Sequence, residues 1–230
     1  MAKDKEGVEN KLEGIESALT RTEHYIEENR KSLSIIAGAI VVAVALYFAF
    51  NRFYLQPKEK NAQRQMYVAE QYFEKDSFNL ALKGDGNYPG FLTIIDEFGL
   101  TDASNLSHYY AGICYKNLGN YKDAIEHLRK FDSSDKIISS EALGAIGDCY
   151  ADLGENDQAV KYYKKAANNN KNDFTTPLYL MRAGILLEEM NNFKDALKIY
   201  QRIEEEYNGT KEGHDIEKYI ARVKIKGNLQ

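Results

Sequence analysis

The sequence predicts an all-α fold: an N-terminal transmembrane helix followed by a solenoid of helical hairpins with a C-terminal capping helix. Two observations carry this prediction. An uncharged, mostly apolar run near the N-terminus is long enough to cross a bilayer as a helix. The C-terminal half repeats one pattern of glycine, alanine and aromatic residues about every 35 residues, which is typical of stacked helical hairpins.

Residues 1–31 form a charged tail that we predict to be helical rather than disordered. Its apolar residues step by three and four, as in a short heptad seam: Val8, Leu12, Ile15, Leu19 and Ile26. Such a seam favours weak association with itself or with a partner helix. Glutamates flank the seam, so anionic lipid is not an expected ligand of this tail.

Residues 32–51 are predicted to form a transmembrane helix. They carry no charge, and aromatic residues gather at their C-terminal end, where an interfacial belt is expected. A cleaved signal peptide is the alternative, but Asn51, Arg52 and Phe53 follow where a small-residue cleavage site should lie. Six basic residues in the tail favour a cytoplasmic N-terminus, with the remainder of the chain outside.

Residues 58–100 are predicted to form a linking helix and a degenerate first hairpin. Pro57 is expected to interrupt the helix just past the membrane, because proline restricts the residue before it. One helix should then run from Lys58 to Leu82, and Phe91–Phe98 should pack against it after a turn.

Three copies of the repeat follow, at residues 101–132, 133–170 and 173–207, and a capping helix is expected at residues 210–226. Thr101 and Thr176 are predicted to be N-caps, and Pro177 to be the first helical residue after the second. In the second copy, Gly147 and Ala159 are expected to face each other where the two helices cross. The residues that recur in register are Gly112, Gly147 and Gly184 in the first helices, and Ala124, Ala159 and Ala196 in the second.

This period and this residue pattern resemble the tetratricopeptide repeat (TPR) family, whose members bind peptides in a groove lined by the first helices. The resemblance implies an apolar groove with acidic edges. The groove positions carried over are Tyr109, Ile113, Lys116 and Asn117 in the first copy, Asp148 and Asp152 in the second, and Met181, Ile185 and Glu188 in the third. The alternative for several of them is a contact with the neighbouring repeat.

The layout of tail, anchor and array resembles the YfgM-like bacterial membrane TPR proteins. That resemblance implies an inner-membrane location with a cytoplasmic N-terminus and a periplasmic array. It also implies partners at the Sec translocon or among periplasmic chaperones and their client polypeptides.

The chemistry-bearing residues predict no enzyme, no cofactor and no metal site. His24, His108, His127 and His214 are scattered without metal-ligand spacing. Cys114 and Cys149 occupy equivalent repeat positions, so they should be buried and too far apart for a disulfide. A net charge of −5 without a long basic block gives no reason to expect nucleic acid.

The function predicted is therefore a membrane-anchored module that binds protein partners or clients. A self-assembling scaffold, a homo-oligomer formed through the tail seam and the anchor, is the alternative. An enzyme or enzyme regulator is disfavoured, because no catalytic set is visible.

Overall fold

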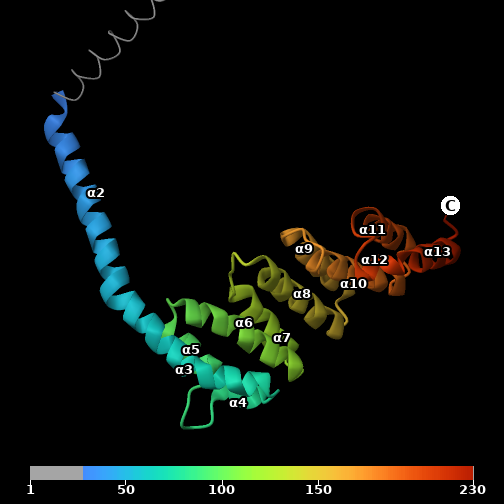
Figure 1. The fold of residues 1–230 in the computed structure, drawn as a ribbon, viewed down its shortest axis with the longest axis horizontal. Coiled ribbons are helices and arrows are strands. Elements are labelled where there is room, and N and C mark those ends of the chain that lie inside the picture. The colour runs from blue at the N-terminus through green and yellow to red at the C-terminus, as the bar shows by residue number, and fades with distance from the viewer. Residues whose placement is uncertain (1–27, 230) are drawn as a thin grey trace, which may run out of the picture. The chain divides into compact units, whose positions relative to one another are not determined.

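The computed structural model describes residues 28–229, and helices make up the regular structure of that part of the chain (Figure 1). The chain divides into two units at Pro57. The heptad seam predicted for the tail lies outside the described residues. The structure is all-α over these residues, as predicted, and its second unit is a solenoid of helical hairpins.

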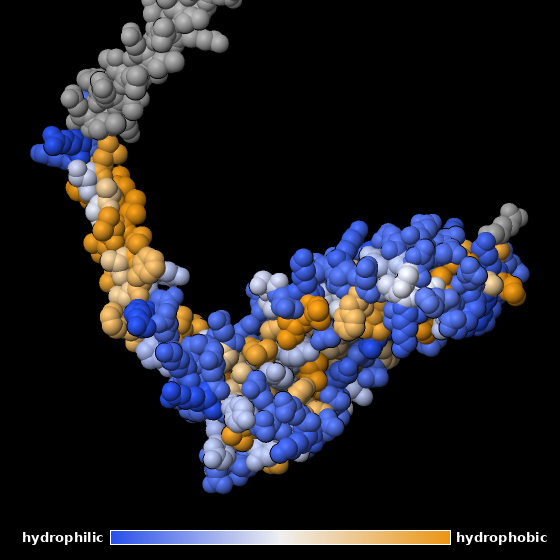
Figure 2. Space-filling view, in the orientation of Figure 1, coloured by the Kyte–Doolittle hydropathy of each residue, from blue (hydrophilic) through white to orange (hydrophobic). Residues whose placement is uncertain are grey.

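The first unit contains helix α2 (Arg30–Phe50) and the π-helical turn η1 (Asn51–Leu55). None of the 21 side chains of α2 is buried. Among the described residues, one helix, Arg30–Glu74, is long and apolar enough to cross a membrane by length and composition. Apolar residues cover α2 in the space-filling view (Figure 2).

Pro57 does not interrupt the chain's helical course, contrary to the prediction. Helix α3 (Gln56–Glu74) begins directly after η1. In η1 the backbone N–H of Gln56 donates to the carbonyl of Asn51, five residues back. In a regular α-helix, a proline ring would clash with the carbonyl four residues earlier, and proline has no N–H to donate. The wider π-helical turn before Pro57 makes room for the ring.

The predicted helix from Lys58 to Leu82 is divided in two. It ends at Glu74, resumes as α4 (Phe78–Lys83), and is followed by α5 (Phe91–Phe98). Asp76 lies between α3 and α4 with a φ of +54°, a left-handed conformation that helices do not continue through. The helices pack around a core that includes Ala62, Met66, Ala69, Leu82 and Phe91.

Three hairpins make up most of the second unit. They pair α6 (Asp102–Asn117) with α7 (Tyr121–Lys130), α8 (Lys136–Asp152) with α9 (Asn156–Asn169), and α10 (Thr175–Glu189) with α11 (Phe193–Glu206). Each turn needs one left-handed residue: Gly119, Gly154 and, where the third copy lacks glycine, Asn191, with a φ of +60°. Asparagine is among the few other residues that tolerate this conformation.

The first helix of each hairpin presents a glycine to a large side chain of the second helix, sixteen residues later. The pairs are Gly112 with Leu128, Gly147 with Tyr163, and Gly184 with Tyr200. The atoms nearest to a Cβ at Gly147 belong to the Tyr163 ring, and that Gly147 also faces Ala159 stays a prediction. Ala159 is fully buried in the core of residues 159–223.

The N-cap prediction is confirmed for Thr101 and wrong for Thr176. The Thr101 hydroxyl accepts a hydrogen bond from the Ser104 N–H at 3.1 Å. Helix α10 begins one residue before Thr176, and the side chain of Asn172 accepts from the N–H groups of Phe174 and Thr175. Asn172 therefore caps the start of α10 in place of Thr176.

The C-terminal end of the array is covered by α12 (Lys211–His214) and α13 (Ile216–Gly227). Ile216 and Val223 of α13 are buried against α11, and the Tyr219 ring lies 5.4 Å from that of Tyr200. The remaining surface of α13 is largely polar and exposed, which suits the end of a solenoid.

Candidate partner-binding site

The nine groove residues taken from the repeat pattern lie on α6, α8 and α10, the first helices of successive hairpins. Helix α8 contacts both α6 and α10. The nine side chains are therefore carried by neighbouring helices: Tyr109, Ile113, Lys116 and Asn117 on α6, Asp148 and Asp152 on α8, and Met181, Ile185 and Glu188 on α10. That they bind a partner stays a prediction.

Asp148 is the centre of a polar network that joins all three helices. Its carboxylate accepts from Lys116 Nζ of α6 at 2.6 Å, from the Arg182 guanidinium of α10, and from the Tyr163 hydroxyl at 3.0 Å. Burial favours the neutral acid, but the hydrogen bonds and charges of Lys116 and Arg182 outweigh it, so the pKa of Asp148 is lowered. The network neutralises Asp148 and links each repeat to the next.

Glu188 is engaged in the same way with the capping helix. Its carboxylate accepts two hydrogen bonds of 2.7 Å from Arg222 and one of 3.0 Å from Lys226, both on α13. The side chain is 8% exposed, and the charge-assisted bonds overcome the effect of burial and lower its pKa. Glu188 therefore belongs to the contact between neighbouring helices, which is the alternative weighed from the sequence.

Tyr109 and Ile113 are half-buried side chains at the α6 end of the face. The Tyr109 hydroxyl donates to Glu141 Oε2 at 3.3 Å, and its ring centroid lies 5.3 Å from that of Phe131. Burial, reinforced by the Glu141 carboxylate, raises the pKa of Tyr109. Ile113 packs against the core of residues 124–162. Both side chains therefore contribute to packing between repeats.

Ile185 is the exposed apolar member of the predicted set. It is 36% exposed and lies at the edge of a hollow of about 310 Å³. Ala151, Tyr163, Arg182, Leu186 and Glu189 complete the lining. Met181, one turn earlier on α10, is half-buried against the core of the third repeat. The hollow is mainly apolar, and its charged members lie on α10.

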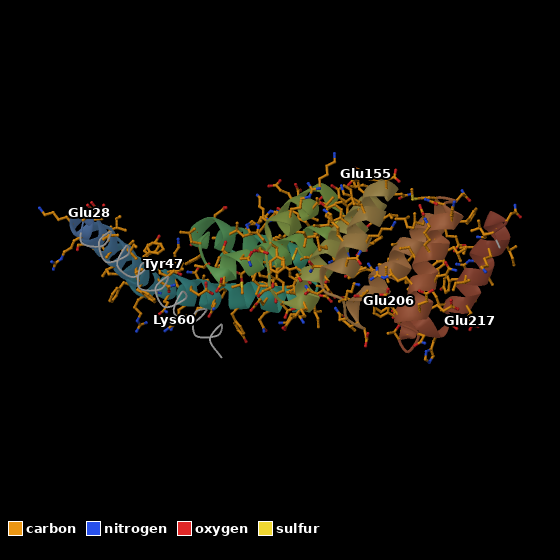
Figure 3. The ribbon with its side chains drawn as sticks, turned by 90° about the horizontal axis from the view of Figure 1, so that it is seen from above. Glu28, Tyr47, Lys60, Glu155, Glu206 and Glu217 are labelled. Atoms are coloured by element: carbon orange, nitrogen blue, oxygen red, sulfur yellow. The ribbon has the colours of Figure 1, made fainter. Side chains whose placement is uncertain are left out.

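Asn117 and Asp152 are exposed polar residues on this face. Asn117 donates its side-chain N–H to the carbonyl of Ile113, within its own helix. Asp152 is the one exposed carboxylate of the nine, because Asp148 and Glu188 are engaged by basic side chains. The groove is thus less acidic than the sequence suggested. Glu155 and Glu217, by contrast, lie at the outer edge of the array (Figure 3).

The basic partners in these networks, Arg182, Arg222 and Lys226, were missed by sequence reasoning. A signal for two of them was present. Arg182 lies 34 residues after Asp148, and Arg222 lies 34 residues after Glu188. Opposite charges one repeat length apart on first helices are placed to pair across the stack, whereas pairs three or four residues apart lie within one helix.

The two cysteines lie inside the hairpins, away from the predicted groove residues at the surface. Cys114 and Cys149 are both free and fully buried, and burial raises the pKa of each thiol to about 12. Within residues 28–229, no three or more histidine, cysteine or carboxylate side chains are grouped to hold a metal ion. The fold is typical of protein-interaction scaffolds.

Comparison with known families identifies the repeats. Residues 140–173 match one tetratricopeptide repeat model, and residues 107–134 and 179–208 match a second one. The structure is similar to that of a Podosopora anserina protein, described as a kinesin light chain with nearly identical TPR-like repeats. The TM-score is 0.54 at 10% identity, over 74% of this chain and 88% of the other, so the likeness concerns the fold. No curated protein matches the chain significantly.

Proposed function

We propose that this chain is a membrane-anchored interaction module whose TPR-like array binds polypeptide partners across α6, α8 and α10. The observation that carries this proposal is the apolar hollow beside Ile185, on a face whose principal charges are already paired. Lys116 and Asp148 are engaged by neighbouring repeats, and Glu188 is engaged by the capping helix. The hollow left for a partner is therefore mainly apolar, with Arg182 and Glu189 in its lining.

An apolar side chain of a bound peptide fits this hollow better than a charged group does. Aromatic and aliphatic anchors dominate the energy of most protein interfaces, whereas charges at the rim contribute little. An anionic ligand would have to displace Asp148 from Arg182 and approach Glu189 against like charge. We therefore expect clients that present apolar side chains from an extended or helical segment.

We further propose that α2 anchors the array in a membrane. It supplies 21 helical residues without a buried side chain, and its apolar surface has no cover within the described chain. From the resemblance of the layout to YfgM-like proteins, we propose that the membrane is a bacterial inner membrane and that the array lies in the periplasm. That location makes exported polypeptides and translocon components the first partners to test.

Site-specific photocrosslinking in native membranes tests the binding face. A photoreactive residue at Ile185 should crosslink partners, whereas one at the exposed Lys194 of α11 serves as a matched control on the second helices. Ile185→Glu should reduce co-purification of those partners at least tenfold, and Lys194→Glu should leave it unchanged. Equal crosslinking from both positions would refute the groove, and crosslinks confined to a second copy of the chain would favour the scaffold alternative.

A further inference from the structure

Two histidines that are distant in sequence meet in the first hairpin, outside the proposed binding face. His108 of α6 and His127 of α7 bring their Nδ1 atoms to 3.1 Å from each other. Their ring centroids are 5.2 Å apart and the rings are tilted by 41°. Both side chains are half-buried and thus still reach solvent. Tyr115 covers His127, with ring centroids 5.4 Å apart.

We propose that His108 and His127 form a binding site for a divalent transition-metal ion. An imidazole nitrogen binds zinc at about 2.0–2.1 Å. Two nitrogens 3.1 Å apart and both at that distance from one ion subtend an angle of about 95–100° at the metal. That angle lies between the octahedral and tetrahedral values, so one ion can bind both Nδ1 atoms with little movement of the helices.

Metal binding here replaces one hydrogen bond and needs no net loss of protons. In the neutral pair, one Nδ1–H donates to the other Nδ1. When both rings carry their proton on Nε2 instead, both Nδ1 lone pairs are free for the ion. The two remaining protons stay on the imidazoles.

Charges of both signs surround the pair. Asp96 of α5 and Asp123 and Glu126 of α7 lie near enough to His127 to act on it electrostatically. Lys130 opposes a cation, but its ammonium is 2.8 Å from the Glu126 carboxylate. No third protein ligand is grouped with the histidines in the part of the chain that the structure describes, so water completes the coordination shell.

The ligand type selects the metal class. Imidazole favours copper, nickel and zinc, whereas calcium and magnesium require oxygen ligands. Among the divalent ions, copper should bind most tightly. Because the two ligands come from different helices, the ion would join α6 to α7 and stabilise the folded hairpin over the unfolded chain.

Copper, nickel and zinc titrations of the detergent-solubilised full chain, purified without a histidine tag, test the site. We expect one ion per chain, and a Cu²⁺ electron paramagnetic resonance spectrum showing two coordinated nitrogens. His108→Asn and His127→Asn should each weaken binding at least tenfold. His24→Ala combined with His214→Ala removes the two other histidines and should change neither the affinity nor the spectrum.

The thermal unfolding midpoint gives a second measurement. Copper should raise it in the wild-type chain and in the control variant, but in neither asparagine variant. The proposal is overturned if the asparagine variants bind as tightly as wild type, if the control variant loses binding, or if the wild-type spectrum shows a single nitrogen. The spectrum needs no substitution, so it decides the matter even if a variant fails to fold.

Discussion

Single glycines set the distance between the two helices of each hairpin. A Cβ at Gly112 would lie 2.5 Å from Leu128 Cγ, one at Gly147 would lie 2.6 Å from Tyr163 Cδ1, and one at Gly184 would lie 2.4 Å from Tyr200 Cε1. Real Cβ atoms do not approach so closely. Glycine recurs in the sequence for a steric reason: in each hairpin, one large side chain of the second helix packs directly against the backbone of the first helix.

Gly184→Ala should destabilise the array by about 1–3 kcal/mol through overpacking. Tyr200 is fully buried, so its ring has no open space into which to move. Urea unfolding of the solubilised chain, followed by circular dichroism, measures the change. Gly209→Ala is the control, because nothing lies within 4 Å of a Cβ at that position. Equal stabilities for the two variants would contradict the packing described.

Successive first helices are held together by ion pairs as well as by apolar packing. Lys116 of α6, Asp148 of α8 and Arg182 of α10 form one chain of contacts, and Glu188 of α10 continues toward α13 through Arg222. These pairs are partly buried, unlike the exposed Lys198–Asp195 pair within α11. Partial burial reduces solvent screening, so these contacts should influence how one repeat is set on the next.

Asp148→Asn should destabilise the array by about 1–3 kcal/mol at pH 7, because Lys116 and Arg182 lose a charged acceptor. The pKa of Asp148 is lowered by folding, so its contribution is present above the ordinary value of 3.8 and is lost as the pH falls below it. The stabilities of wild type and variant should therefore converge in acid.

Urea unfolding between pH 7 and pH 3 measures this convergence. Asp195→Asn is the matched control, since its exposed pair with Lys198 should contribute less than about 1 kcal/mol. A difference between wild type and Asp148→Asn that grows as the pH falls would rule out the ion-pair explanation.

At the scale of the whole molecule, the proposed anchor decides which pool of partners the array meets. Positive charge in the tail favours a cytoplasmic N-terminus, and a large folded region crosses largely regardless of its charge. One labelling experiment can establish on which side of the membrane the array lies. The two native cysteines make that experiment clean, because both are fully buried with raised pKa values.

Lys194→Cys should react with a membrane-impermeant maleimide in intact cells, because residue 194 is exposed on α11. The wild-type chain is the background control and should stay unlabelled. Ser17→Cys, in the tail, should react only after the cells are permeabilised. The opposite pattern would place the array in the cytoplasm and remove exported polypeptides from the list of candidate partners.

The sequence by itself determined the repeat architecture. Gly112, Gly147 and Gly184 recur because the first helix of each hairpin approaches a large side chain of the second helix equally closely. A steric requirement that repeats along the chain produces a repeat in the sequence. The apolar run of α2 was equally visible, since length and composition are local properties. The division between α3 and α4 was missed because it depends on one left-handed residue, Asp76, that has no strong local signal.

Only the tertiary structure decided which side chains meet. Gly147 lies against the Tyr163 ring, Asp148 and Glu188 are neutralised by neighbouring helices, and His108 lies against His127. Periodicity assigns a residue to a face of its own helix. The distance between atoms on two helices depends on how those helices are stacked and on which rotamers the packing permits. The contacts within the candidate site and within the histidine pair both depend on such distances between helices, so periodicity in the sequence did not predict them.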